Sequence, residues 1–75
     1  MTKNDVGINA GIIWRLLDEK GALTIAEILK HTEFSSEYMF AAIGWLLRED
    51  KIIFFEKDDN EYVILTDAHY SEMYF

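Results

Sequence analysis

The chain of 75 residues contains no cysteine and no proline. Without cysteine it can form neither disulfides nor thiolate metal sites, two supports that small domains often use. A chain of this length buries only about 60–65% of the surface that it exposes when unfolded, so its core is thin. We therefore expect self-association to add stability, and we predict a homodimer.

Long apolar runs are also absent, since the longest are far shorter than the roughly 18 residues that a membrane span requires. The first residues, MTKNDVGINAG, include an acidic residue and lack the long apolar centre of a signal peptide. These two absences predict a cytoplasmic protein with no membrane partner.

Basic residues are scarce: there are 7 Lys and Arg against 14 Asp and Glu, which gives a formal charge of −7. This balance favours solubility and disfavours non-specific binding to phosphate. Hydrophobic residues make up 51% of the chain and aromatic residues 15%, which excludes a disordered protein. We expect a single domain over residues 1–75, with its core in residues 1–66 and an aromatic tail in residues 67–75.

The stretch from Ser35 to Ile53 predicts a helix that leads directly into a strand. Ser35 can cap the helix, the polar quartet at residues 48–51 ends its apolar pattern, and a β-rich segment follows. Apolar residues recur within the helix at steps of three and four, which places them on one face. The core face predicted on this basis consists of Met39, Phe40, Ile43, Leu46 and Leu47.

Two helices are expected before this one. Asn4 or Asp5 can cap the first, which runs to about Lys20 and stops at Gly21. Thr24-Ile25-Ala26-Glu27 has the spacing of a capping box and predicts a short second helix that ends near His31-Thr32. Two short helices joined by a tight turn form a helix-turn-helix.

Three extended segments complete the pattern. Residues 22–24 form a short strand that can pair with a later hairpin, whose strands we place at Ile52 to Lys57 and Tyr62 to Thr66. The sequence thus predicts an α+β fold that is mostly α. It is a winged helix-turn-helix with three helices, a short first strand and a β-hairpin wing.

Two motifs strengthen this interpretation. GINAGIIWRLL (Gly7 to Leu17) and AAIGWLLREDKI (Ala41 to Ile52) resemble a family of small, stand-alone bacterial winged helix-turn-helix proteins of unassigned function, frequent in gut anaerobes. The resemblance covers most of the chain through Phe55. It implies a winged-helix fold, homodimerisation and a role in DNA binding or transcription, and it brings no established functional residues.

In a winged helix the outward face of the third helix enters the DNA major groove. Helical spacing predicts that this face carries Glu37, Tyr38, Ala41, Gly44, Trp45 and Arg48. Affinity for DNA comes largely from phosphate neutralisation by Lys and Arg, so we expect weak intrinsic affinity. The candidate DNA-binding residues are Lys30, His31, Arg48, Lys51 and Lys57.

Apolar side chains without a core position support an alternative, a dimeric protein-interaction module on a winged-helix scaffold that does not bind DNA. The candidate interface residues are Ile8, Ile12, Tyr38, Trp45, Tyr70, Tyr74 and Phe75. Trp and Tyr are typical anchors of binding energy. Packing of Trp45, and of Ile8 and Ile12, against the wing or the tail is the competing interpretation.

Catalytic and metal-binding patterns are missing. His31 and His69 are far apart in the sequence, and neither belongs to a pair with metal-ligand spacing. Residues 58–60 lack the glycine and the distal glutamate of a calcium loop. We predict a protein that is not an enzyme and that has neither a cofactor nor a metal. Of the two remaining functions we favour a DNA-binding transcription regulator and keep the interaction module as the alternative.

Overall fold

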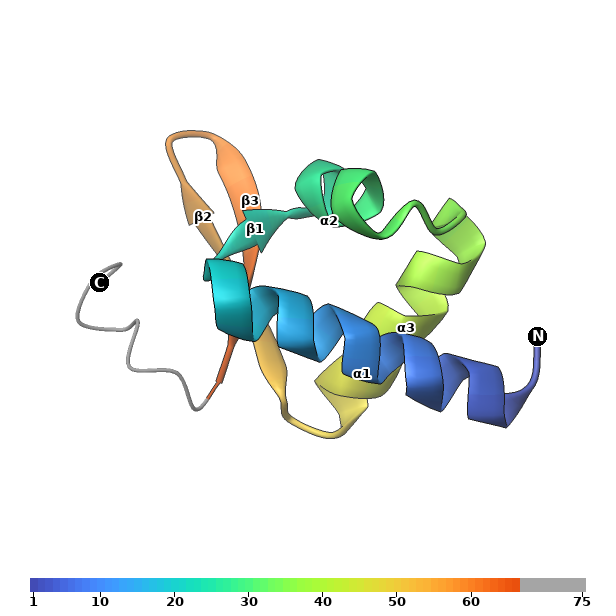
Figure 1. Ribbon diagram of the computed structural model, residues 1–75. Helices are drawn as coiled ribbons and strands as arrows, with labels where there is room; N and C mark the ends of the chain where they lie inside the picture. Colours follow the sequence, from blue (N-terminus) through green and yellow to red (C-terminus); the bar gives the residue numbers. More distant parts are fainter. Residues whose placement is uncertain (67–75) are drawn as a thin grey trace.

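The computed structural model describes residues 1–66, over which three helices and three strands form one compact unit (Figure 1). The helices are α1 (Lys3–Lys20), α2 (Ile25–Thr32) and α3 (Ser36–Arg48). The strands are β1 (Leu23–Thr24), β2 (Ile52–Lys57) and β3 (Asn60–Leu65), which form one antiparallel sheet in the order β1-β3-β2. This is the predicted winged helix-turn-helix, with its short first strand paired to the hairpin.

The start of α1 corrects one prediction. Its N-cap is Thr2, not Asn4 or Asp5. The Asp5 backbone N–H donates to Thr2 Oγ1 at 3.1 Å, and the Thr2 N–H donates to Asp5 Oδ2 at 2.9 Å. Asp5 is therefore the reciprocal partner in a capping box, three residues after the cap. The hydrogen bond from the Thr2 backbone lowers the pKa of the Asp5 carboxyl.

The predicted capping box of α2 is confirmed. The Glu27 N–H donates to Thr24 Oγ1 at 3.2 Å, and the Thr24 N–H donates to Glu27 Oε1 at 2.8 Å. The bond from the Thr24 backbone is the main reason that the pKa of Glu27 is lowered. Ser35 caps α3 as predicted, its Oγ accepting from the Tyr38 N–H at 3.4 Å.

The hairpin turn is shorter than predicted. Asp58 and Asp59 alone connect the strands, with φ of 52° and 67°, and Lys57 pairs with Asn60. Positive φ at both central residues is typical of the two-residue type I′ turn, whose twist matches that of the strands. β3 therefore begins at Asn60, two residues before the predicted start, because the polar Asn60 and Glu61 belong to the ladder and not to the loop.

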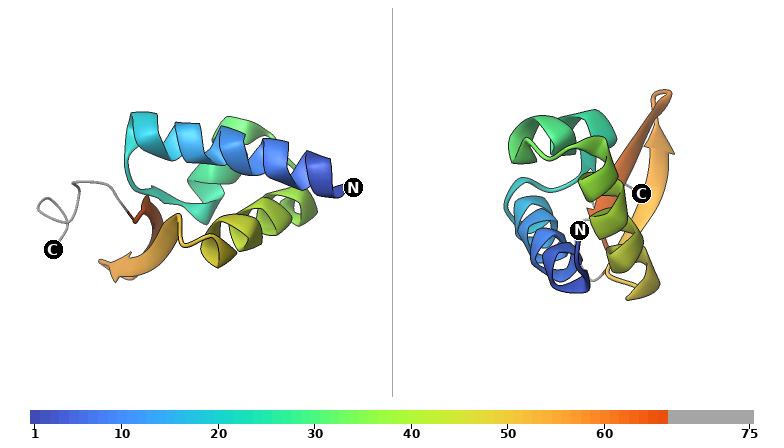
Figure 2. Two further views of the ribbon diagram at one scale, coloured as in Figure 1. Left: turned by 90° about the horizontal axis from the view of Figure 1, so that it is seen from below. Right: turned by 90° about the vertical axis from the view of Figure 1, so that its right-hand side faces the viewer.

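The core lies between the helices and one face of the sheet. α1 packs along α3, and the hairpin extends from the helices as the wing (Figure 2). The core residues on the helices are Ala10, Ile13, Leu17, Ile28, Met39, Ala42, Ile43 and Leu46, and those on the strands are Leu23, Ile52, Val63 and Leu65. All are apolar, and no buried side-chain polar atom within residues 1–66 lacks a hydrogen-bond partner.

The predicted core face of α3 is partly wrong. Phe40 is 56% exposed and Leu47 is 38% exposed, whereas Ala42 is fully buried. Each residue advances the helix by about 100°, so Phe40 and Leu47 share one side, roughly 80–100° away from Met39. Two apolar stripes thus overlap on this helix. The packed one carries Ala42, which lets α1 approach the α3 backbone closely.

Candidate protein and nucleic-acid interfaces

The exposed side of α3 is the surface that a winged helix presents to its ligand. We call it the recognition face and define it by Glu37, Phe40, Gly44, Leu47 and Arg48, all of which are exposed. Leu47 follows Phe40 by seven positions, so their side chains lie two helical turns apart on the same side. They form an apolar edge of the recognition face, next to which Glu37 lies near the start of the helix and Arg48 at its end.

The only cation on the recognition face has a carboxylate beside it. Arg48 Nη1 lies 3.5 Å from Glu49 Oε2, and the two side chains are 86% and 46% exposed. An exposed pair of this kind contributes little stability, yet it places a negative charge next to the base. This arrangement weakens the attraction of Arg48 for a phosphate.

The predicted outward residues of α3 lie on two sides of the helix. Glu37, Gly44 and Arg48 belong to the recognition face, as expected. Tyr38 and Trp45 are 39% and 37% exposed and share another flank by their seven-residue spacing, and Trp45 lines a pocket together with α1, while Ala41 is half-buried. The two aromatic side chains are thus separated from the surface expected to face DNA.

The five candidate DNA-binding residues are exposed, but the structure does not gather them into one cluster. Lys30 and His31 end α2 and lie near the start of α3, because only residues 33–35 connect the two helices. Arg48 ends α3, about 18 Å along the helix axis, and Lys51 lies in the turn that follows. Lys57 lies at the far end of β2 and adjoins the acidic hairpin turn.

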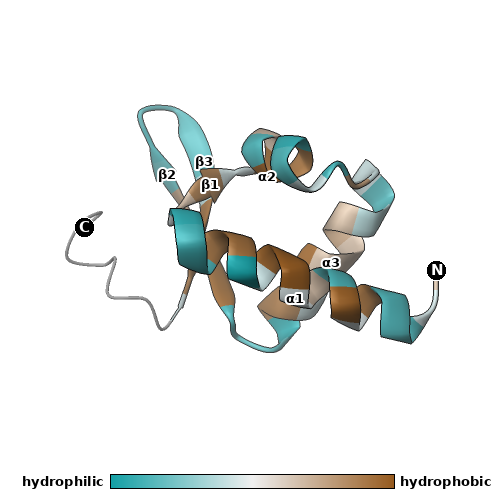
Figure 3. Ribbon diagram, in the orientation of Figure 1, coloured by the Kyte–Doolittle hydropathy of each residue, from teal (hydrophilic) through white to brown (hydrophobic). Residues whose placement is uncertain are grey.

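The wing adds negative charge. Glu56, Asp58, Asp59 and Glu61 surround Lys57 at its hydrophilic tip (Figure 3). A duplex contacted by this tip would meet four carboxylates and one ammonium group. Closer to the helices the wing is apolar: the rings of Phe55 and Tyr62 stack with their centroids 5.4 Å apart.

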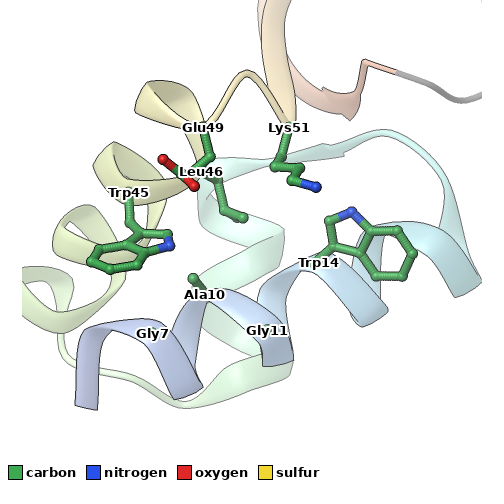
Figure 4. A pocket seen from close by; sticks show the side chains of 8 residues that line it. All are labelled: Gly7, Ala10, Gly11, Trp14, Trp45, Leu46, Glu49 and Lys51. Carbon is green, nitrogen blue, oxygen red and sulfur yellow. The ribbon is translucent and has the colours of Figure 1, made fainter. Parts of the chain in front are cut away.

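A groove between α1 and α3 forms the second candidate surface. Its lining residues are Gly7, Ala10, Gly11, Trp14, Trp45, Leu46, Glu49 and Lys51 (Figure 4). We call it the α1–α3 groove. Trp14 from α1 and Trp45 from α3 stand toward its two ends, with Ala10 between them. A Cβ atom built on Gly7 or Gly11 would have no neighbour within 4 Å, so internal packing does not require glycine at either position.

Several predicted interface residues lie at or near this groove. Ile8 is 55% exposed and lines a hollow that continues from Gly7 to Trp45, whereas Ile12 is half-buried. Among the described residues, those that line pockets together with Trp45 belong to α1, to α3 and to the turn after α3. Tyr70, Tyr74 and Phe75 lie outside the described residues.

Phe40, Leu47 and the two groove glycines are surface features that the sequence interpretation missed. A detectable signal existed for the glycines, since Gly7 and Gly11 are four residues apart and so fall on one helical side. The exposure of Phe40 and Leu47 had no such signal, because either apolar stripe of α3 could have faced the core.

Two further properties of residues 1–66 concern metal binding and the spanning of a membrane. No three or more His, Cys, Asp or Glu side chains within this range are grouped closely enough to hold a metal ion. Neither α1, α2 nor α3 is both long and apolar enough to cross a bilayer.

Comparison with known proteins agrees with the fold. The model of the family described as "Winged helix-turn-helix domain (DUF2582)" matches residues 1–65. The uncharacterized protein MJ1608 of Methanocaldococcus jannaschii is 46% identical over 61 residues, which is 79% of this chain and 86% of that protein. The solution NMR structure of protein BT2368 from Bacteroides thetaiotaomicron superimposes with a TM-score of 0.76 at 31% identity, covering 100% of this chain and 87% of that one. The chain therefore belongs to the DUF2582 family of winged helix-turn-helix domains, as its sequence motifs implied.

Proposed function

We propose that this protein is a non-enzymatic, cytoplasmic regulatory domain whose recognition face binds protein, and that a second copy of the chain is its first partner. The observation that carries this proposal is the exposure of Phe40 and Leu47 on one edge of the recognition face of α3. A helix that reads DNA uses this position for groups that pair with phosphates and base edges. Apolar side chains there suit a desolvated protein contact instead.

Electrostatics favour the same choice. A domain that binds DNA gains affinity by placing cations against phosphates, and each phosphate contact releases a counterion. The recognition face offers one cation, Arg48, with the carboxylate of Glu49 beside it and that of Glu37 near the other end of the helix. The acidic wing tip adds repulsion. A protein partner has no such uniform negative charge and can pair with both signs.

Self-association also suits the thin core. Stable interfaces bury about 1,200–2,000 Å² in total, and their energy comes mainly from a few well-packed apolar or aromatic anchors. Phe40 and Leu47 can supply such anchors. Phe54 on β2 is a further exposed aromatic side chain, at 37%, and it shares the core side of the strand with Ile52.

Sedimentation equilibrium at micromolar concentration tests this function. We expect a dimer for the natural chain, and at least a tenfold weaker association for Phe40→Ser combined with Leu47→Ser. Ile53→Ser is the matched control, because Ile53 is 43% exposed but lies on the opposite side of the sheet from the core. A dimer that tolerates the double substitution, or a chain that stays monomeric throughout, would contradict the proposal.

DNA binding in transcription is the second candidate function, supported by the winged-helix family and by Arg48 at the end of α3. Fluorescence anisotropy with a random-sequence duplex measures it. We expect weak binding at low salt that disappears near physiological salt, since surface electrostatics are then screened. Arg48→Gln should weaken the low-salt binding more than Lys20→Gln, which removes the same charge from the end of α1. Tight binding at physiological salt would overturn the preference for a protein partner.

A further inference from the structure

The α1–α3 groove has the chemistry of an aromatic-binding site. Indole rings stand toward its two ends, Ala10 and Leu46 supply aliphatic surface, and Gly7 and Gly11 leave the α1 backbone uncovered. Aromatic side chains gain energy from offset or edge-to-face contacts with such rings, in addition to the burial of their area. A docked segment can therefore approach α1 closely and place a ring between Trp14 and Trp45.

The charge around the groove is opposite in sign to that of the whole protein. Lys51 lines it, while Lys3 and Arg48 border the hollow around Trp45, so three of the chain's seven basic residues lie here. Glu49 also lines the groove, and its carboxylate lies beside the Arg48 guanidinium. A local excess of cations on a chain of charge −7 selects an acidic ligand.

We propose that residues 67–75 of the same chain, DAHYSEMYF, bind in the α1–α3 groove. This segment, which lies outside the described residues, has the chemistry that the groove selects. Asp67 and Glu72 supply negative charge, and Tyr70, Tyr74 and Phe75 supply aromatic rings. It contains no Lys or Arg that would oppose docking.

The point at which the segment begins supports binding within one chain. The Thr66 N–H donates to the Lys51 carbonyl at 3.0 Å, and the Thr66 hydroxyl donates to the Asp50 carbonyl at 2.7 Å. Thr66, the last described residue, therefore lies next to Lys51, which lines the groove. Nine residues reach about 30 Å when extended, whereas α1 advances only about 17 Å from Lys3 to Trp14. A tether this short gives the segment a high effective concentration at the groove.

The outer side of the sheet is the competing apolar surface for this segment. Ile53 is 43% exposed there, and its neighbour Ile64 is buried although it lies outside the main core cluster. This surface belongs to the wing, whose tip carries four carboxylates. The acidic tip lies about four residues along the strand from Ile53, so its repulsion is largely screened there, and the preference for the groove depends on the attraction by Lys3, Arg48 and Lys51.

Paramagnetic relaxation in the full chain tests the proposal. Because the chain has no cysteine, Met73→Cys provides a single attachment site for a nitroxide. We expect the label to cause a several-fold loss of the indole N–H signals of Trp14 and Trp45, which reappear when the nitroxide is reduced. A label on Ala26→Cys, exposed on α2, is the control for non-specific effects and should leave these two signals intact.

The source of the effect is separated by mixing spin-labelled chains with isotope-labelled chains that carry no nitroxide. Signal loss that persists on the isotope-labelled chains of the mixture would show that a second copy supplies the segment, and would overturn binding within one chain. Loss at Ile53 and Ile64, with both indoles unaffected, would place the segment on the sheet and also overturn the proposal. If the nitroxide caused no signal loss at any of these residues, the proposal would also be overturned.

A charge reversal tests whether cations near the groove attract residues 67–75. Arg48→Glu in the Met73→Cys background should restore most of the indole signal, because it removes one of the cations near Trp45. Lys30→Glu is the matched control, since Lys30 is likewise exposed in the last turn of a helix, α2, and should leave the signal loss unchanged. If Arg48→Glu and Lys30→Glu showed the same loss of the indole signals, the proposal that charge selects this site would be contradicted.

Discussion

Two sides of α3 carry large apolar residues, and these residues have opposite fates in the structure. One side carries Met39, Ala42, Ile43 and Leu46, all at or below 4% exposure, and the other carries Phe40 and Leu47 in contact with solvent. The buried side has four apolar residues and no charge, whereas Phe40 and Leu47 share the exposed side with Glu37 and Arg48. The alanine on the buried side allows α1 to pack closely there. The larger side chains of Phe40 and Leu47 remain on the surface.

The largest expected difference between the two sides is in stability. Met39→Ala should lower the free energy of unfolding by about 2–5 kcal/mol, because it leaves a cavity in a fully packed site. A core of this size supplies only about 3–5 kcal/mol, so much of this variant should be unfolded. Phe40→Ala should change the free energy by no more than about 0.5 kcal/mol.

Urea denaturation followed by circular dichroism measures both variants. The protein should be dilute enough that self-association does not contribute to either value. A large loss for Phe40→Ala under those conditions would show that Phe40 belongs to the core, which would remove the apolar anchor of the recognition face.

An intermediate loss of stability is expected when a larger side chain replaces the alanine on the buried side of α3. Ala42 is fully buried where α1 and α3 pack together, so Ala42→Leu forces extra methyl groups into occupied space. We expect a loss of about 1–3 kcal/mol in the same denaturation experiment. An unchanged or raised stability would mean that α1 and α3 are less closely packed than the structure shows. The comparison between the two sides would then fail.

The smallest change in stability, a gain instead of a loss, is expected from a substitution on the exposed side of α3. A Cβ atom at Gly44 would have no neighbour within 4 Å, and the residue lies inside the helix. Gly44→Ala should therefore raise the free energy of unfolding by about 0.5–1 kcal/mol through helix propensity alone. Gly21→Ala is the contrasting control and should destabilise, because φ is 80° at Gly21. A destabilising Gly44→Ala would indicate a contact on the recognition face within the monomer.

Local signals in the sequence predicted most of the fold. The capping box of Thr24 and Glu27, the Ser35 cap and the short strand that pairs with the hairpin were all correctly predicted from spacing. Such features depend on residues three or four positions apart or on alternating strand patterns. The Thr2 cap was missed because Asp5 is also a good capping residue, and the sequence does not say which position it occupies.

The candidate surfaces were harder to predict. The shortage of cations was visible in the composition, and the candidate DNA-binding and interface residues remain predictions. Ile8, Tyr38 and Trp45 are exposed, as an interface role requires. The α1–α3 groove was not foreseen, because its lining residues come from two helices and from the turn at Lys51. Their proximity depends on the angle and depth at which α1 crosses α3.

The sequence by itself determined the approximate position of each helix and strand, the winged-helix order of those elements and the acidic character of the wing, because these depend on neighbouring residues and on composition. Only the tertiary structure decided which apolar side of α3 is buried, that Phe40 and Leu47 face outward, and that Trp14 and Trp45 flank one groove. Those outcomes depend on packing between elements far apart in the chain. There the fit of side chains between α1 and α3, together with the hydrophobicity of the residues, selects the side that is buried.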